Sequence, residues 1–474
     1  MKNLPPYLTK ENITFSKIMI KTDLEFCLNE LNEVLNLFDG CENIDIRHIF
    51  TQKEDRLINT IVLGGKSYAY GNLVKPFKDK IEEKRLVKRF AKLSLYKALS
   101  AYTGKSLPWG ALTGIRPTKL AYSQLESEGE FKDFFISTMK VSEEKTNLIA
   151  RILENQKGLY KKDDDNSDFF VFVPFCPSRC RYCSFISSDI KSAKKYVDLY
   201  VDTLVKEINQ SKTHIKNLRS IYVGGGTPVS LSNENLDKIL SAMDDINNGV
   251  EFTVEAGRPD VISEETLSLL LKHKVTRICI NPQTFNDKTL EKIGRNHTAK
   301  DVIDKFNLAK GKFSINMDLI AGLDGETFED FKYSLDKAIS LSPDGITVHT
   351  LAVKRGSYLA EEERRLNVEE IDKMVDYAHK TLQDSGYNPY YLYRQKYMAG
   401  CLENTGYAKA GKECLYNINA MEEISSTVAC GANAISKVVT KLGEKIERYA
   451  SPKDVKTYIE KIDTILKEKE RLFS

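Results

Sequence analysis

The sequence lacks the features that mark secreted and membrane-embedded proteins. None of its apolar runs reaches the roughly 18 residues that a membrane-spanning helix requires. Its opening residues, MKNLPPYLTKENITF, contain no apolar core of the kind found in signal peptides. Nine cysteines among 474 residues are an odd number in a long chain, which argues against a disulfide framework. We therefore expect a cytoplasmic protein in a reducing compartment, without a membrane span.

The sequence also lacks an excess of charge of one sign. The 70 lysines and arginines nearly balance the 67 aspartates and glutamates, for a formal net charge of +3. The basic residues are scattered, so neither nucleic acid nor an acidic membrane surface is an expected partner. With 41% apolar and 29% charged residues, the composition is that of a globular protein, and the length predicts two or three domains.

The first 165 residues are expected to form an N-terminal α+β and helical domain. Strand-like segments at 16–22 and 57–63 flank a helix-like segment at 23–38. A helical pattern then leads up to Gly104, which is placed where a helix would end. The polar break KKDDDNSD (161–168) is interpreted as the linker to the next domain.

Residues 166–360 alternate short apolar runs with helix-length amphipathic segments. The runs are FFVFVPF, SIYVGGG, EFTVEAG, RICINPQ, FSINMDLIAGL and GITVHTLAV. Such alternation predicts βα units with a parallel sheet, and the length falls short of the about 250 residues of an eight-unit barrel. We predict an α/β fold with a partial (βα)6 TIM-type barrel. A mostly helical region, 361–474, is expected to follow and to cover the substrate.

Special residues cluster where the predicted strands end. In parallel sheets, chemistry is found at this carboxyl edge. The residues at or just after strand ends are the cysteines of the segment FCPSRCRYCSF (175–185), Gly224 to Gly226, Glu255, Gln283, Asp318 and His349. Taken singly, each polar residue could be a helix cap, and His349 could be a satisfied core histidine. Cys279, inside a strand, is interpreted as a small core side chain.

Cys176, Cys180 and Cys183 lie within eight positions, and four interpretations compete for them. A helical stripe of buried thiols is disfavoured by Pro174 and Pro177. Structural zinc would need a fourth Cys or His at standard spacing, and a catalytic thiol needs only one cysteine. An iron–sulfur cluster with three thiolates would leave one iron open for a reactant. The spacing favours the cluster, with zinc and a core stripe left open.

The surrounding motifs extend this pattern. The segment CPSRCRYCSF resembles the cluster loop of radical S-adenosylmethionine (SAM) enzymes. The segments YVGGGTP, TVEAGRPD, NPQTFND, IGRNHT and NMDLIAGLDGET follow in the order of the oxygen-independent coproporphyrinogen III oxidase family. Two further segments, LPWGALTGIRPTKL (107–120) and YYLYRQKYMAGCLENTGYA (390–408), resemble the HemZ branch of that family. The resemblance covers most of residues 105–440.

The resemblance implies two cofactors, a [4Fe-4S] cluster and SAM. It assigns the cluster to Cys176, Cys180 and Cys183, with SAM chelating the open iron. The implied SAM contacts are Tyr182, Gly225, Gly226, Thr227, Glu255, Gln283, Arg295, Asp318 and Ala352. The glycines would let the methionine amino group approach the backbone closely, and the planar cation of Arg295 suits a carboxylate.

The resemblance also implies an oxidoreductase of porphyrin and haem biosynthesis. In that family, one-electron reduction of SAM yields a 5′-deoxyadenosyl radical that takes a β-hydrogen from a coproporphyrinogen III propionate. Loss of CO2 and one electron leaves a vinyl group, and two rounds give protoporphyrinogen IX. The implied partners are the porphyrinogen substrate and an external one-electron donor such as flavodoxin or ferredoxin. Alternatives are a haem-binding, chaperone-like relative without decarboxylase activity and a radical SAM enzyme that degrades haem.

The chain departs from the family pattern on the substrate side. Phe170 and Phe172 replace a Tyr-x-His pair, and Ser184 follows the third cysteine where a further cysteine is common. A tetra-acid porphyrinogen needs cations and a flat apolar wall. Two segments offer both and are expected to meet over the barrel mouth; packing between domains is the alternative. The candidate substrate residues are Trp109, Arg116, Lys119, Tyr393, Arg394 and Lys396, together with Tyr391.

Overall fold

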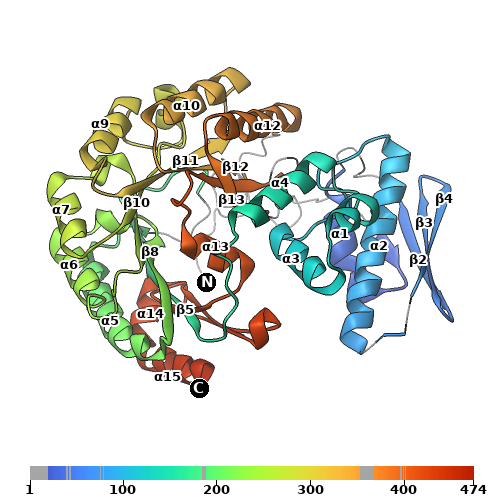
Figure 1. Ribbon diagram of the computed structural model, residues 1–474, viewed down its shortest axis with the longest axis horizontal. Helices are drawn as coiled ribbons and strands as arrows, with labels where there is room; N and C mark the ends of the chain where they lie inside the picture. The colour runs from blue at the N-terminus through green and yellow to red at the C-terminus, as the bar shows by residue number, and fades with distance from the viewer. Residues whose placement is uncertain are drawn as a thin grey trace, which may run out of the picture. The chain divides into compact units, whose positions relative to one another are not determined.

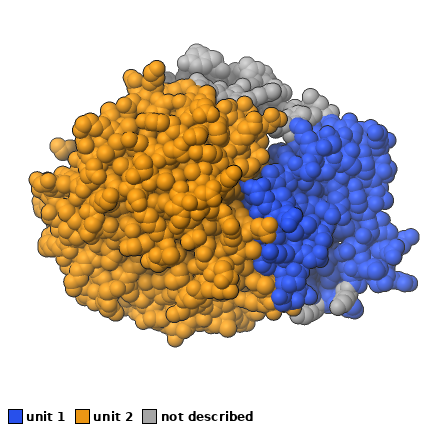
Figure 2. Space-filling view, turned by 45° about the horizontal axis from the view of Figure 1, so that its top comes forward, with its two compact units in different colours: residues 1–114, 128–146 blue, residues 115–127, 147–474 orange. Residues whose placement is uncertain are grey.

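The computed structural model describes residues 20–38, 41, 44–74, 76–77, 79–183, 188–352, 367–395, 398, 400 and 402–474. Contacts divide the chain into two compact units, which Figure 2 distinguishes by colour. Unit 1 comprises 1–114 and 128–146, and unit 2 comprises 115–127 and 147–474. The predicted boundary at 165 and the separate C-terminal domain are therefore not what the structure has, because 361–474 packs into the same unit as the barrel.

Unit 1 is an α+β unit with a four-stranded sheet in the order β1-β2-β3-β4. Strands β2 to β4 form an antiparallel meander, and β1 pairs with β2 in parallel. The predicted strands at 16–22 and 57–63 are present as β1 and β3, whereas β2 and β4 were missed. Its elements are β1 (Ile20–Thr22), α1 (Leu28–Leu35), β2 (Ile46–Lys53), β3 (Arg56–Leu63), β4 (Lys66–Leu73) and α2 (Lys80–Thr103).

Helix α2 ends as predicted, because Gly104 adopts a left-handed conformation with φ of 71° and accepts the chain reversal without a Cβ penalty. Asp79 caps its other end by accepting from the backbone N–H groups of Ile81 and Glu82. Two helices follow, α3 (Pro117–Glu128) and α4 (Glu143–Asn155). Among the described residues, no helix combines the length and apolar character needed to cross a membrane.

The six predicted barrel strands are all present, and they pair in parallel in the order β5-β8-β9-β10-β11-β12. Helices α5, α6, α7, α9, α10 and α12 lie around the outside of this sheet (Figure 1). The strands are β5 (Asn166–Val173), β8 (Asn217–Gly225), β9 (Glu251–Gly257), β10 (Arg277–Ile280), β11 (Ser314–Ala321) and β12 (Gly345–Thr350). The helices between them are α5 (Lys194–Ser211), α6 (Asn233–Ser241), α7 (Glu264–Lys272), α8 (Asp287–Lys292), α9 (Ala299–Ala309) and α10 (Phe328–Leu341).

The C-terminal region contains the predicted helices, and it also contains strands that were not predicted. It adds five strands to the barrel sheet, with β15 parallel to β5 and β14 antiparallel to β12, so the full sheet has 11 strands. Strands β14 and β15 are short and buried along their whole length, which removes the alternation that would have revealed them. The elements are α12 (Val368–Asp384), β13 (Asn388–Tyr393), β14 (Asn404–Ala408), α13 (Leu415–Glu422), β15 (Ser426–Cys430), β16 (Ile435–Thr440), β17 (Lys445–Ala450), α14 (Val455–Glu460) and α15 (Ile462–Phe473).

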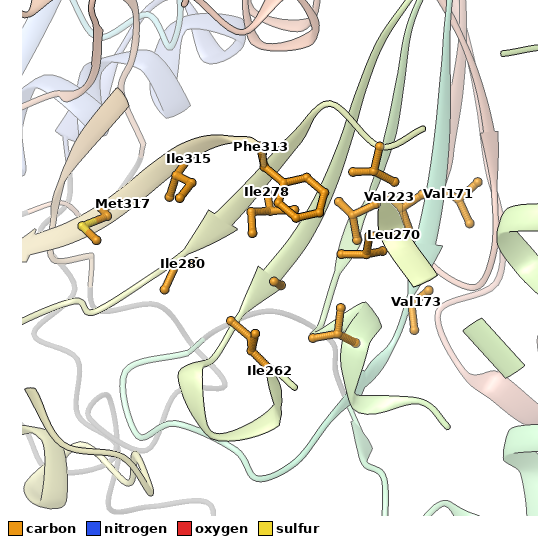
Figure 3. Packing of buried hydrophobic residues seen from close by; sticks show 14 of the residues in the cluster. Val171, Val173, Val223, Ile262, Leu270, Ile278, Ile280, Phe313, Ile315 and Met317 are labelled. Atoms are coloured by element: carbon orange, nitrogen blue, oxygen red, sulfur yellow. The ribbon is translucent and has the colours of Figure 1, made fainter. Parts of the chain in front are cut away.

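The two faces of the barrel strands have different roles. Alternate side chains point outward into an apolar core, where those labelled in Figure 3 include Val171, Val223, Ile278 and Ile315. All four are buried. The positions between them face the inside of the sheet, and they carry the aromatic and polar side chains described next. Packing on the outer face therefore fixes the register that presents the inner face.

Candidate active site

The three predicted cluster ligands lie on one loop after β5, and we call residues 176–183 the cysteine loop. Its first residue is held by a short parallel pair, β6 (Phe175–Cys176) with β7 (Ser188–Asp189). Further along, the Cys183 N–H donates to the Cys180 carbonyl at 3.1 Å, which closes a turn. All three thiols line a cavity of about 520 Å³ at the carboxyl edge of the barrel strands.

The nine predicted SAM contacts line the same cavity. They come from the cysteine loop and from the segments that end or follow β8, β9, β10, β11 and β12. The residues are Tyr182, Gly225, Gly226, Thr227, Glu255, Gln283, Arg295, Asp318 and Ala352. Residues spread over 170 positions of sequence therefore meet in one place, as the strand-end argument predicts. Their roles in binding SAM stay predictions.

Gly226 is required by close packing. A Cβ built there would lie 2.5 Å from the Phe175 carbonyl oxygen and 3.0 Å from the Cys176 Sγ. Its neighbour Thr227 donates its backbone N–H to the same carbonyl at 2.7 Å, and its hydroxyl lies 3.7 Å from the Cys176 Sγ. The glycine run thus seats the start of the cysteine loop, which is a second reason for glycine beside the predicted approach of a cofactor.

Gln283 and Arg295 line the cavity and are held in place by hydrogen bonds, and each keeps one buried polar atom available to a ligand. Gln283 has a left-handed backbone (φ 66°), fixed because its N–H bonds to the Asp318 carbonyl and its carbonyl accepts from Ile320. Arg295 donates to the Asn281 carbonyl at 2.6 Å and to the Tyr182 hydroxyl at 3.2 Å. The Gln283 Oε1 and Arg295 Nε atoms are buried and have no hydrogen-bond partner among the described residues.

Glu255 lies on the inner face of the barrel beneath the cysteine loop. Burial raises the pKa of its carboxyl to about 7, although the Tyr222 hydroxyl, which donates to it at 2.6 Å, opposes that rise. Nearby, the His349 Nε2 lies 3.7 Å from the Asp318 Oδ2, and its Nδ1 lies 3.4 Å from the Tyr393 hydroxyl. The cavity therefore contains one carboxyl, that of Glu255, that can hold a proton near neutral pH.

Aromatic side chains form one wall of the cavity. The rings of Phe170, Tyr222 and Tyr416 stack on one another, with centroids 4.4 to 6.1 Å apart and interplanar angles of 13° to 30°. Tyr391 and Tyr393 form a second parallel pair with centroids 6.4 Å apart. Phe170 therefore does not merely replace a tyrosine of the family pattern but packs into this wall. All five rings line the cavity.

These residues fit the implied cofactors. Three thiols without competing disulfides suit a cluster with an open site. The orphaned atoms of Gln283, Arg295 and Asn281, whose Oδ1 also lacks a partner, are a donor and two acceptors for a polar ligand such as SAM. A single zinc ion fits less well, because no three Cys, His, Asp or Glu among the described residues are grouped closely enough to hold one ion.

The predicted substrate residues are only partly brought to the cavity. Tyr391 and Tyr393 line it, but Trp109, Arg116, Lys119 and Arg394 are not among the described residues that do. Arg116 and Lys119 instead pair with Glu423 at 2.9 and 2.7 Å. Trp109 is buried within unit 1, with 2% of its surface exposed. Lys396 and Ser184 lie outside the described residues.

The two candidate substrate segments do touch within unit 2. The Arg394 N–H donates to the Ile115 carbonyl at 2.8 Å, and the Arg394 side chain is buried. The prediction that these segments enclose a substrate is not tested by this contact. Arg394 stays a predicted substrate residue on the same footing.

Sequence reasoning missed several residues on the inner face. Tyr222, Thr253, Cys279 and Asn316 all line the cavity. Tyr222 precedes Gly224 by two positions, and Thr253 and Asn316 precede Glu255 and Asp318 by two. A period of two counted back from each strand-end residue would have found them. Cys279 is buried as predicted, but it faces the cavity and not the outer core.

Comparison with known proteins places this site in a family. The model of the radical SAM superfamily matches residues 170–338. The oxygen-independent coproporphyrinogen-III oxidase-like protein HemZ of Bacillus subtilis is 40% identical over 392 residues, 78% of each chain. The chain belongs to the radical SAM superfamily, in its HemZ-like family.

Two further proteins are similar to this chain at lower identity. The heme chaperone HemW of Haemophilus influenzae is 30% identical over 301 residues, which cover 61% of this chain and 75% of that protein. The solved structure of the coproporphyrinogen III oxidase HemN from Escherichia coli matches with a TM-score of 0.53 at 20% identity, over 68% of this chain and 73% of that one, and so supports the fold alone. Membership in the radical SAM superfamily implies a [4Fe-4S] cluster and SAM, the two cofactors that the cavity residues fit.

Proposed function

We propose that this radical SAM protein oxidatively decarboxylates the propionates of coproporphyrinogen III to vinyl groups, with protoporphyrinogen IX as the product. One observation carries the proposal: the predicted cluster and SAM residues line a single cavity that continues into an aromatic wall. The similarity to a protein named for oxygen-independent coproporphyrinogen-III oxidase supports the choice of substrate.

The cofactors supply the hard step when bound, which is generation of a carbon-centred radical able to take a hydrogen atom from an unactivated carbon. The chain supplies position. Arg295, held by the Asn281 carbonyl and the Tyr182 hydroxyl, can bind a carboxylate through its free Nε. Gln283 can accept a hydrogen bond in the same cavity.

Glu255 and Tyr222 form a hydrogen-bonded pair on the inner face of the barrel. With a pKa of about 7, Glu255 holds a proton on its carboxyl for much of the neutral range and can donate a hydrogen bond to a ligand hydroxyl or amine. His349 bridges Asp318 and Tyr393, which orients its ring. The stacked rings of Phe170, Tyr222 and Tyr416 offer a flat apolar surface of the kind that a tetrapyrrole would contact, and they exclude water.

An anaerobic assay tests the proposal. Reconstituted protein is incubated with coproporphyrinogen III, SAM and a chemical reductant, and the products are analysed for vinyl groups, CO2 and 5′-deoxyadenosine. Vinyl product with matching CO2 supports the proposal. Cleavage of SAM without vinyl product, in protein that carries its full complement of iron, would refute the substrate while leaving the radical chemistry in place.

A haem-binding chaperone role is the second candidate, because the HemW proteins of Bacillus subtilis and Haemophilus influenzae are 34% and 30% identical over 52% and 61% of this chain. It predicts stoichiometric haem retention without turnover. The same preparation can be titrated with haem and followed by absorbance. Tight one-to-one binding together with no vinyl product would favour the chaperone role over decarboxylation.

A further inference from the structure

The cysteine loop is held in part by contacts from outside it. Pro177 has no N–H to donate, and within the loop the Cys183 N–H donates to the Cys180 carbonyl. Such a loop loses backbone entropy when it is fixed in one conformation. Hydrogen bonds from neighbouring segments can offset that loss and hold the three thiols where the cavity needs them.

Arg258 makes a close side-chain contact with the loop. Its Nη1 donates to the Ser178 Oγ at 2.6 Å and to the Ser178 carbonyl at 3.3 Å. The Ser178 hydroxyl in turn donates to the Gly294 carbonyl at 3.4 Å, so Ser178 is held from two sides. Three residues later, the Arg181 N–H donates to the Ile293 carbonyl at 3.0 Å.

Arg258 is itself rigidly mounted. It follows β9 directly, beside Gly257, whose φ of 61° turns the chain, and it precedes a short helical turn that begins at Pro259. Only 2% of its surface is exposed. Asp260 accepts from its Nε and Nη2 at 2.9 and 2.7 Å, a two-pronged ion pair that neutralises the buried cation and fixes the plane of the guanidinium.

We propose that Arg258 is a positioning residue that latches the cysteine loop into its ligand-ready conformation before iron arrives. The latch joins Ser178, between the first two cysteines, to the end of a core strand 80 residues later in the sequence. A lysine could not replace it, because an ammonium cannot bind Asp260 through two nitrogens and Ser178 through a third. The proposal rests on the cluster of the proposed function but not on the identity of the substrate.

Amide hydrogen exchange in the iron-free, full-length protein tests the latch directly. In Arg258→Ala, the amide of Arg181, bonded to Ile293, should exchange about tenfold or more faster than in the wild type. Arg219→Ala is the matched control, because that guanidinium also donates to two backbone carbonyls, of Leu159 and Lys161, away from the cysteine loop. It should leave exchange in 176–183 unchanged. Equal exchange in Arg258→Ala and wild type would overturn the proposal.

Cluster measurements give the second readout. Arg258→Ala and, more weakly, Ser178→Ala should reduce the iron retained after reconstitution and broaden the electron paramagnetic resonance spectrum of the reduced cluster. Arg258→Lys should lose iron as Arg258→Ala does, because lysine lacks the planar guanidinium that binds Asp260 and Ser178 together. If Arg258→Lys instead behaves like wild type, positive charge alone is sufficient and the proposal is refuted. Should Arg258→Ala fail to fold, Ser178→Ala decides the exchange test. Wild-type protein that binds iron but makes no vinyl product would refute the proposed substrate and leave the latch standing.

Discussion

At the scale of single residues, packing and hydrogen bonding restrict which residue and which backbone conformation each position of the site can have. Gly226 has no side chain because the Phe175 carbonyl and the Cys176 thiol occupy the position a Cβ would take. Gln283 keeps a left-handed backbone because two bonds to β11 hold it there. Even a small substitution is therefore expected to disturb the structure at these positions. The three cysteines are restricted further, because they are also the predicted ligands of the cluster.

Replacing Gly226 by alanine should cost the cluster more than the fold. The added methyl group would push the Phe175 carbonyl or the Cys176 Sγ away, and both are fixed by β6 pairing and by Thr227. We expect iron retention to fall by about tenfold or more, with destabilisation of about 1–3 kcal/mol. Iron analysis and urea unfolding measure the two effects. Gly114→Ala, where the nearest atom lies 3.9 Å away, is the control, and equal losses in both variants would contradict the prediction.

Replacing any one of Cys176, Cys180 and Cys183 by alanine should abolish the absorbance of a four-iron cluster, because all three thiolates are predicted to be its ligands. Anaerobic reconstitution followed by iron and sulfide analysis provides the measurement. Cys27→Ala, at a buried thiol in unit 1, should keep its iron. Normal iron content in a Cys180→Ala variant would rule that thiol out as a ligand.

At the scale of elements, one charged cluster joins the start of α3 to the C-terminal region. Helix α3 joins unit 2 although the residues on both sides of 115–127 belong to unit 1. Arg116 and Lys119 reach Glu423 just after α13, and Arg448 of β17 contacts the same carboxylate at 2.7 Å. Burial alone would raise the pKa of Glu423, but its bond to Lys119 and the charge of Arg116 outweigh that and lower it to about 2.

This cluster predicts a structural role for Arg116. A double-mutant cycle with Arg116→Met and Glu423→Gln should give a coupling of about 1 kcal/mol at pH 7, modest because Arg116 is one-third exposed. Since the pKa of Glu423 is depressed, the coupling is present above about pH 4.5 and is lost as the pH falls toward 2. Urea unfolding measures it. A raised KM for porphyrinogen with unchanged stability in Arg116→Met would instead support the predicted role in substrate binding.

At the scale of the whole molecule, unit 2 buries carboxyl groups whose ionised form would be better stabilised by water. Glu422 is almost fully buried; Gln156 donates to its Oε1 at 3.1 Å, and its Oε2 has no partner in the described part of the chain. Burial raises the pKa of this carboxyl to about 7, as it does for Glu255 and Glu326. Each group favours folding below pH 4.5, and this contribution is lost as the pH rises through 7.

Glu422→Gln should therefore change how stability depends on pH. Relative to wild type, the variant should gain about 3 kcal/mol in free energy of unfolding between pH 4.5 and pH 8, because glutamine does not ionise. Urea unfolding at several pH values measures the difference. Glu444→Gln, at an exposed position, is the matched control. A constant offset between Glu422→Gln and wild type across this range would contradict the pKa assignment.

The sequence by itself determined the six parallel strands, the end of α2 at Gly104, and the strand-end residues that line the cavity. These follow from local patterns, because apolar runs repeat with the strand period and special residues stand where the runs end. Tertiary structure alone decided the rest. The strands β14 and β15 are buried on both faces, so their sequences show no alternation of apolar and polar residues. Arg116 and Lys119 pair with Glu423, about 300 residues later in the sequence. Ser178 accepts a hydrogen bond from Arg258, 80 residues later. Such contacts depend on which surfaces folding brings together, and no spacing within a single segment encodes them.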